Sequence, residues 1–273
     1  MFAIVLFLIA ACVCYYYTCV VRARFAQDVP CAQPCYPLIG NGLSFLEKSP
    51  VKLFQNVVRP FNQFDRWFKV WLGPQLMLCT SHPVLAESVL SHPKCLDKPF
   101  FYSFVQLEQG ILTRKCVLAS RRSALEEEFY AANDSPAMLD RLLSVNEDGP
   151  LSDTEIVQNI YSIVGAGNDT TAHSLGHTCL FLAMHPAVQG NLYQELRDVF
   201  YSTDEPTTEE KLKQLSYMEC VIKESLRLAP PGATVAREAQ EDLTVEGQLV
   251  PRGTTVVVSL FALHRRKDFW GAD

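Results

Sequence analysis

The sequence predicts a mainly α-helical fold with small β-sheets, preceded by an N-terminal transmembrane helix. Three observations lead to this prediction. Residues 1–21 are apolar and uncharged, residues 152–184 keep an apolar helical spacing without proline, and residues 67–80 and 243–265 alternate like strands around Gly and Pro turns. The 273 residues, 48% of them hydrophobic, provide enough apolar material for a sizeable core.

Residues 1–21 are long enough to span a membrane. At about 1.5 Å per residue, a helix of this length crosses a hydrocarbon core of about 30 Å. Arg22 and Arg24 follow at once, which favours a signal anchor with the downstream chain on the cytoplasmic side of the membrane. A cleaved secretory signal is the alternative.

Residues 22–42 form a basic, Pro-rich segment. Pro30, Pro34 and Pro37 stiffen the backbone, so we expect a rigid hinge between membrane and domain. A Pro-rich ligand for a partner module is the alternative reading.

Composition argues against nucleic acid as a partner and helps to predict the state of the cysteines. The net charge of -6, without a long Lys or Arg run, argues against nucleic acid. The ten cysteines show no CxxC pair and no zinc-ligand spacing. Given the expected cytoplasmic exposure, we predict reduced and mostly structural thiols.

The first half of the chain contains a predicted hairpin and a short helix. Residues 67–80 split at Gly73-Pro74 into two apolar, partly alternating runs, and residues 83–90 have helical spacing. The aromatic stretch Phe100 to Phe104 is interpreted as core or membrane-facing wall. A seam is expected near Cys116, where the pattern changes abruptly.

The second half begins with a long predicted helix. Ser152 and Glu155 have the spacing of a capping box, and the apolar pattern then continues from Asp153 to about Met184. A second helix is predicted at 209–228, ended by Pro230-Pro231-Gly232, and strands follow within 243–265.

A polar motif, Ala-Gly-Asn-Asp-Thr-Thr at 166–171, lies in the middle of the long helix. Read alone, it resembles a helix N-cap after a Gly turn. Within a continuous helix, Gly167 adds no bulk and the Thr170 hydroxyl can bond a carbonyl three or four residues earlier, so the helix can bend and open a polar pocket. Asp169 can exchange protons with water while Thr170 donates and accepts, as a proton relay requires.

Two further pairs are candidates. Glu224 and Arg227 lie three residues apart on the second helix, which alone indicates no more than a solvated ion pair. His173 and His177 have the spacing of metal ligands but lack the Glu of a His-Glu-x-x-His motif. No metal site is therefore predicted, and a helical membrane-associated metal hydrolase is kept as a remote alternative.

Taken together, these motifs resemble the cytochrome P450 family of haem-thiolate monooxygenases. Residues 166–171 are similar to the family's oxygen-activating helix motif, residues 224–227 match its Glu-x-x-Arg pair, and residues 226–270 resemble the sequence that follows that pair. The anchor, the hinge and residues 70–83 resemble a microsomal N-terminus, which implies the endoplasmic reticulum membrane with the catalytic part facing the cytoplasm. Within the family the sequence looks most like the fatty-acid hydroxylases and their insect relatives.

The resemblance implies roles for the motif residues. Asp169 and Thr170 would relay protons, Ala166 and Gly167 would lie against the haem, and Arg237 would contact a haem propionate, because guanidinium suits a carboxylate. Ala166 stands where that branch often has a Glu capable of esterifying the haem, so covalent attachment is not expected.

The resemblance also implies a core pair, a cofactor and partners. Glu224 and Arg227 would be structural and hold the core beneath the haem. The implied cofactor is haem, and the implied partners are an NADPH-dependent reductase, the membrane and a small apolar substrate.

The chain departs from the family pattern in two places. No cysteine lies in the Phe-x-x-Gly-x-x-x-Cys context of the haem-thiolate loop, and the middle helices are absent at the seam. The expected divisions are 1–21 (anchor), 22–42 (hinge), 43–115 (β-rich part) and 116–273 (long helix, Glu-x-x-Arg helix and β-ribbons). We expect exposed apolar faces and no activity for the chain as written. The alternative function is a non-catalytic, truncated, membrane-anchored protein, from a splice form, a partial gene model or a pseudogene.

Overall fold

The computed structural model describes residues 2–17, 21, 23–99, 139, 142, 152–202 and 204–271. The chain forms two compact units, one made of residues 1–100 and 177–273 and the other of residues 101–176. The predicted seam at Cys116 and the aromatic stretch 100–104 lie outside the described residues. Helix α6 (Asp153–Met184) begins in the second unit, and its last two turns belong to the first.

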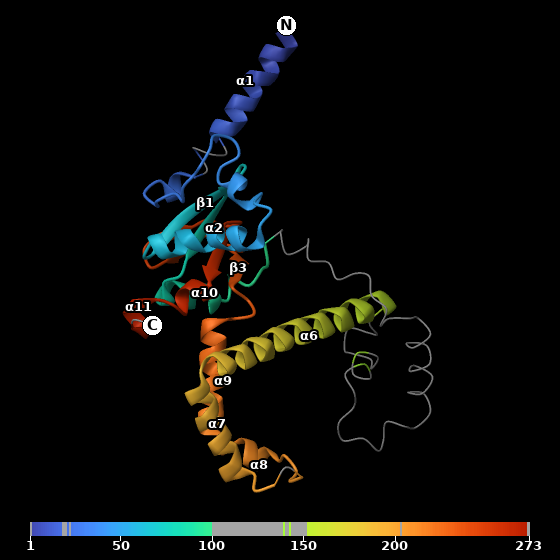
Figure 1. The fold of residues 1–273 in the computed structure, drawn as a ribbon. Coiled ribbons are helices and arrows are strands. Elements are labelled where there is room, and N and C mark those ends of the chain that lie inside the picture. The colour runs from blue at the N-terminus through green and yellow to red at the C-terminus, as the bar shows by residue number, and fades with distance from the viewer. Residues whose placement is uncertain are drawn as a thin grey trace. The chain divides into compact units, whose positions relative to one another are not determined.

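The first unit contains all the strands that the structure describes, together with short helices (Figure 1). Its elements before the second unit are α1 (Phe2–Tyr16), η2 (Arg24–Ala26), η3 (Gly42–Phe45), α2 (Pro50–Gln63), β1 (Trp67–Leu72), β2 (Gln75–Thr80) and α3 (Pro83–Leu90). Its elements after the second unit are α7 (Pro186–Val199), α8 (Glu209–Leu212), α9 (Ser216–Leu228), β3 (Thr234–Glu238), β4 (Leu243–Val245), β5 (Gln248–Val250), β6 (Thr255–Ser259), α10 (Leu260–Leu263) and α11 (Lys267–Trp270).

The larger sheet joins strands from the two ends of the chain in the order β1-β2-β6-β3. Strands β1 and β2 pair antiparallel from Trp67–Thr80 to Leu72–Gln75, which confirms the predicted hairpin. Strand β6 then runs parallel to β2 and antiparallel to β3. Strands β4 and β5 form a separate ribbon whose turn residues, Glu246 and Gly247, both have positive φ, as a tight type I′ turn requires.

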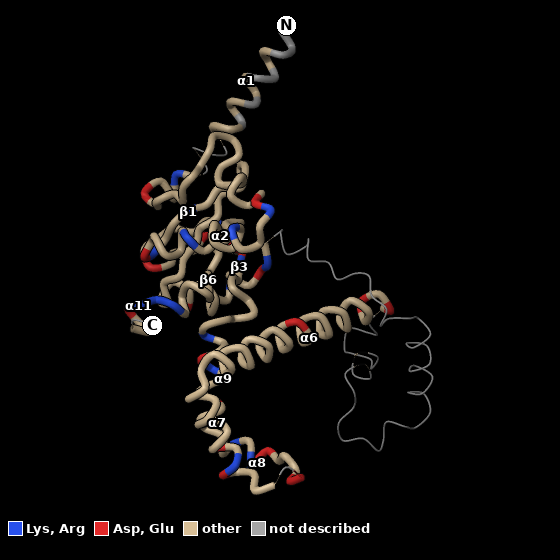
Figure 2. The backbone as a smooth tube through the Cα atoms, viewed as in Figure 1, with Lys and Arg blue, Asp and Glu red and all other residues tan. Residues whose placement is uncertain are grey.

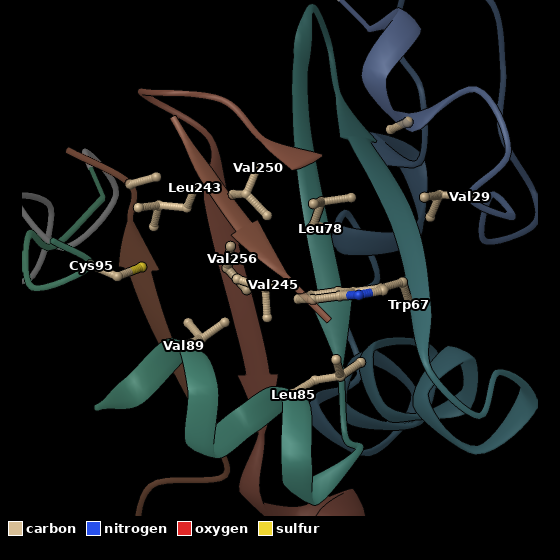
Figure 3. Close-up of a cluster of buried hydrophobic side chains, with 12 residues drawn as sticks. Val29, Trp67, Leu78, Leu85, Val89, Cys95, Leu243, Val245, Val250 and Val256 are labelled. Atoms are coloured by element: carbon tan, nitrogen blue, oxygen red, sulfur yellow. The ribbon is translucent and has the colours of Figure 1, made fainter. Parts of the chain in front are cut away.

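The core lies among the larger sheet, the ribbon and helix α3 (Figure 3). Alternating strand positions direct apolar side chains into one cluster, because successive residues of a strand face opposite sides. Its buried members are Ala26, Val29, Trp67, Leu78, Leu85, Val89, Cys95, Ala239, Leu243, Val245, Val250 and Val256. Val29 carries the Pro-rich segment into this core, so the segment is packed against the fold.

Helix α1 accounts for part of the predicted span 1–21, and residues 1 and 18–20 of that span lie outside the described residues. Helix α1 has 15 residues, about 22 Å of length at 1.5 Å per residue. Among the helices in the part of the chain that is described, none has the length and apolarity needed to cross a bilayer.

Helix α6 has the predicted bounds, and its first turn has the predicted cap. Glu155 Oε2 accepts hydrogen bonds from the Ser152 backbone N–H at 2.8 Å and from its hydroxyl at 2.7 Å. The Glu155 backbone N–H in turn donates to Ser152 Oγ at 3.3 Å. This reciprocal capping box fixes where the helix begins.

The helix predicted at 209–228 is wrong as a single element. Helices α8 and α9 are separated at residues 213–215. The carboxylate of Glu195, on α7, accepts from the backbone N–H groups of Tyr217 at 2.7 Å and Met218 at 2.8 Å. This side chain from another helix satisfies the first turn of α9 and so starts a new helix there.

The strands predicted within 243–265 end earlier than expected. Residues 260–263 form helix α10, not strand. The Ser259 hydroxyl accepts a hydrogen bond from the Ala262 backbone N–H at 3.2 Å, and this cap ends β6 and begins the helix.

Candidate active site

The motif at 166–171 lies inside an uninterrupted helix. Residues 153–184 are α-helical throughout, so the reading of the motif as a helix N-cap is wrong. Asp169 is the only Asp, Glu, Lys or Arg residue between 156 and 184. The middle of α6 accordingly carries little charge (Figure 2).

The Thr170 hydroxyl makes the predicted bond to the backbone. Thr170 Oγ1 donates to the carbonyl of Ala166 at 2.7 Å. Its own carbonyl accepts from Ser174 Oγ, also at 2.7 Å. A threonine that bonds back to residue i−4 occupies a backbone acceptor with its hydrogen and leaves its oxygen lone pairs free to accept.

The surroundings of this hydroxyl are open. Asp169 and Thr170 are exposed, so the described residues do not enclose the predicted polar pocket. A Cβ built on Gly167 meets no atom within 4 Å. Ala166 and Gly167 therefore give this turn of the helix a low, flat surface on which a planar group can lie.

Most of α6 exposes its apolar side chains, as predicted from the sequence. Ile156 is the one buried residue among those described in the helix. The large exposed apolar side chains are Ile163, Val164, Leu175, Leu180 and Met184. These side chains give the described part of α6 an exposed apolar surface, which is unfavourable in water.

The Glu224–Arg227 pair on α9 is a bidentate ion pair. Arg227 Nε donates to Glu224 Oε2, and Arg227 Nη2 donates to Oε1, each at 2.7 Å. The Arg227 side chain is 8% exposed and that of Glu224 54% exposed. The arginine is thus the buried member, which rules out a fully solvated pair.

Arg227 also has partners that its own helix does not supply. Its Nη1 donates to the carbonyl of His264, just after α10, at 2.8 Å, and its guanidinium lies 5.1 Å from the ring centre of Trp270, on α11. Burial lowers the pKa of His264, although a hydrogen bond to the Arg227 backbone opposes this effect. Arg227 therefore links α9 to two segments about 40 residues later in the sequence.

Sequence reasoning missed these partners. Helical spacing identifies neighbours within one helix, but His264 and Trp270 follow a strand and two turns. The only available signal was the resemblance, which assigned the pair to the core without naming the acceptor.

Arg237, on β3, carries a positive charge that fits an anionic group. Its Nη1 donates to the carbonyl of Ala236 at 2.9 Å, and the side chain is half-buried. Among the described residues, no carboxylate forms an ion pair with it. A partly desolvated guanidinium without a carboxylate partner among the described residues is chemically suited to an anionic group such as a haem propionate.

The predicted site residues fall in two groups. Ala166, Gly167, Asp169 and Thr170 belong to the second unit, whereas Glu224, Arg227 and Arg237 belong to the first.

The metal-hydrolase alternative depends on His173 and His177. His173 Nδ1 lies 2.7 Å from the Asp169 carbonyl, within its own helix. Across residues 2–99 and 152–271, apart from those left undescribed, no group of three or more His, Cys, Asp or Glu side chains is placed to hold a metal ion.

Comparison with known proteins identifies the family. The cytochrome P450 family model matches residues 112–272, more than half of the chain. The chain belongs to the cytochrome P450 family. This membership confirms the resemblance inferred from the motifs.

The relatives of this P450 chain include proteins of vertebrates and insects. It is 40% identical over 249 residues to cytochrome P450 4V2 of Rattus norvegicus, covering 88% of this chain and 44% of the relative. It is 43% identical over 135 residues to the Homo sapiens protein of the same name, covering 49% and 26%. It is 28% identical over 228 residues to probable cytochrome P450 4d20 of Drosophila melanogaster, covering 81% and 43%. The matches thus span less than half the length of these relatives.

A solved structure supports the fold. The crystal structure of a cytochrome P450, CYP102L1, aligns with a TM-score of 0.70 and 17% identity, covering 90% of this chain and 80% of that one. The P450 family comprises haem-thiolate monooxygenases, whose cofactor is haem.

Proposed function

We propose that this chain carries the oxygen-activating helix and the haem-supporting core of a haem-thiolate monooxygenase that inserts one oxygen atom from O2 into a small apolar substrate. The observation that carries the proposal is the Thr170 hydroxyl, bonded to the Ala166 carbonyl at 2.7 Å beside Asp169, the only Asp, Glu, Lys or Arg residue in 156–184. When bound, the haem supplies the redox-active iron at which O2 is reduced.

The relay is assigned to Asp169 and Thr170. The exposed Asp169 carboxylate takes protons from water and passes them to the Thr170 oxygen, whose lone pairs are available. The Thr170 hydroxyl then gives up its hydrogen bond to the Ala166 carbonyl and donates its hydrogen to the group that receives the proton. A positioned donor of this kind contributes rate factors of roughly 10² to 10⁴ in enzymes.

The remaining residues hold the cofactor and the fold. Arg237 would bind a haem propionate through its guanidinium, and Ala166 and Gly167 would leave room for the haem beside α6. Glu224 and Arg227 keep the end of α9 attached to α10 and α11.

The proposal extends to the anchor, the partner and the division of the chain. The apolar, uncharged residues 1–21 support a transmembrane anchor in the endoplasmic reticulum, with the catalytic part facing the cytoplasm. The electron donor is then an NADPH-dependent reductase of the same membrane. The divisions are the anchor 1–21, the hinge 22–42 and two P450 parts, 43–115 and 116–273.

Labelled dioxygen tests the proposed reaction. The product of the full-length native transcript, including a thiolate-bearing segment, is loaded with haem and combined with the reductase and NADPH in lipid vesicles. Fatty acids of graded length serve as apolar substrates. We expect one labelled oxygen atom in each product molecule; a product labelled only from water would exclude a monooxygenase, and a transcript without a thiolate segment would favour the non-catalytic function.

A further inference from the structure

A cavity of about 350 Å³ lies where three segments of the first unit meet. The first segment contains Ala23 and Phe25 and follows the apolar N-terminal run, the second is the β1–β2 hairpin, and the third is the turn between β5 and β6. None of the residues that line the cavity is an Asp or a Glu. The cavity therefore presents no negative charge of its own lining to a bound group.

Thr254, in the turn before β6, is a buried lining residue with an unbonded hydroxyl. The residue is only 7% exposed, and its backbone N–H donates to the Pro251 carbonyl at 3.0 Å. Its hydroxyl forms no hydrogen bond with any described residue, and the oxygen is not among the fully enclosed ones, so solvent reaches it. Because Thr254 lines the cavity, the cavity provides this access. A polar group kept unbonded in a buried residue is available to a ligand.

Three more lining side chains can donate hydrogen bonds. They are the Trp71 indole, the Gln75 amide and the Arg252 guanidinium, and none of these groups is bonded to a described residue. Asp242 accepts the Arg252 backbone N–H at 2.8 Å, but it does not line the cavity, and no described carboxylate forms an ion pair with the guanidinium. One cation with several neutral donors suits the oxygens of a phosphate group.

The lining also has an apolar part. Phe25 and Leu76 line the cavity, and both are half-buried because they pack against the core cluster. A ligand matched to both kinds of surface carries a phosphate and an apolar body in one molecule. A phospholipid has this chemistry, whereas inorganic phosphate lacks the apolar part.

The connectivity of the chain relates this cavity to the membrane. Ala23 lines the cavity and is separated from the apolar residues 1–21 by one residue. Two residues of extended chain span at most about 7 Å, and each headgroup layer of a bilayer is about 5–7 Å thick. With residues 1–21 in the bilayer, Ala23 lies at the level of the headgroups. The choice of a lipid over a free phosphate rests on this anchor, which belongs to the proposed function.

We propose that this cavity binds the headgroup of an anionic phospholipid. The phosphate oxygens accept hydrogen bonds from the Arg252 guanidinium and the Thr254 hydroxyl, and the glycerol with the first acyl carbons lies against Phe25 and Leu76. Arg24, next to Ala23, forms no ion pair with a described carboxylate and adds positive charge beside the cavity.

A short-chain lipid tests the cavity separately from the anchor. The full chain in an uncharged detergent is titrated with dihexanoyl phosphatidic acid, and heat is measured by isothermal titration calorimetry. Inorganic phosphate and dihexanoyl phosphatidylcholine are the comparison ligands. We expect saturable binding of one phosphatidic acid per chain, about tenfold or more tighter than either comparison ligand. Equal affinity for inorganic phosphate, or equal affinity for phosphatidylcholine, would overturn the proposal.

Three variants locate the binding. Arg252→Gln should weaken phosphatidic acid binding about tenfold or more, because it removes a charged donor. Thr254→Val keeps the shape of the side chain and removes only the unbonded hydroxyl, so it should fold normally and weaken binding roughly threefold or more. Arg59→Gln, which removes an exposed arginine of α2 that does not line the cavity, should bind like wild type. If Arg252→Gln and Thr254→Val are folded by circular dichroism and bind like wild type, the cavity is not the site.

Carbonate extraction of membranes that contain the full chain tests the anchor by itself. If the chain resists extraction but the folded chain in detergent does not bind phosphatidic acid, the anchor stands and the proposed headgroup site is wrong. If carbonate releases the chain but phosphatidic acid binds with the expected effects of the variants, the anchor is wrong and the headgroup site is supported.

Discussion

Replacing Arg227 with alanine should destabilise the first unit strongly. The change removes both hydrogen bonds to Glu224 and leaves the His264 carbonyl without this donor. Because Glu224 is about half exposed, water screens the ion pair, and we assign it only about 1 kcal/mol. The unpaired carbonyl adds about 1 kcal/mol, and lost burial of the side-chain stem adds about 1–2 kcal/mol. Together these effects lower the free energy of unfolding by about 3–4 kcal/mol.

Urea unfolding of the full chain, followed by circular dichroism, measures this effect. A matched control lies on the same helix, where Lys223 and Glu219 form an ion pair with both side chains well exposed. Lys223→Ala should leave the unfolding midpoint unchanged, because solvated pairs contribute little. The unfolding midpoint of Arg227→Lys should lie between those of the wild type and Arg227→Ala, since lysine keeps the charge but lacks the planar guanidinium.

In the full-length protein expressed with haem available, Arg227→Ala should abolish haem incorporation, as the core role requires. If its unfolding midpoint matches that of Lys223→Ala and haem is incorporated normally, the assigned core role of Arg227 is wrong.

Two further predictions concern the stability of the first unit. Gly40→Ala should lower the free energy of unfolding by about 3 kcal/mol, because Gly40 has φ +65° and its Cβ would lie 2.4 Å from the Trp71 carbonyl. Gly232→Ala, where a Cβ meets no atom within 4 Å, is the control, and equal urea midpoints for the two would contradict the reasoning. Burial lowers the pKa of His264, so its stabilising contribution is complete above its unfolded pKa of about 6.5 and is lost as pH falls through its folded pKa. The difference in stability between wild type and His264→Gln should therefore depend on pH below about 6.5, and a constant difference would exclude this titration.

Local signals predicted the elements that depend on neighbours in sequence. Ser152 and Glu155 bond each other within one turn, and the Thr170 bond reaches only to residue i−4, so sequence spacing contains both. Likewise, Gly73 and the alternating residues around it were sufficient to predict the β1–β2 hairpin.

Elements that depend on distant partners could not be predicted in this way. The break before α9 depends on Glu195, more than 20 residues earlier. The ring of Pro60 argues against a helix at residues 50–63, yet α2 forms there with Pro60 buried. The acceptor of Arg227 at His264 depends on how α10 packs. The site roles came from family resemblance, since spacing alone left Glu224 and Arg227 as an ordinary ion pair.

The most direct test of the account is the coupling of NADPH oxidation to product formation in the haem-loaded full-length protein with Thr170→Ala. Thr171→Ala is the matched control, because it removes the same hydroxyl one position away on a different side of the helix, and Thr170→Ser restores a hydroxyl at the site. We predict that Thr170→Ala diverts reducing equivalents to hydrogen peroxide and lowers coupling by about tenfold or more, since positioned proton transfer contributes roughly 10² to 10⁴. Thr171→Ala and Thr170→Ser should stay near wild type. Unchanged coupling in Thr170→Ala, or an equal loss in Thr171→Ala, would contradict the assignment of α6 as the proton-delivering helix.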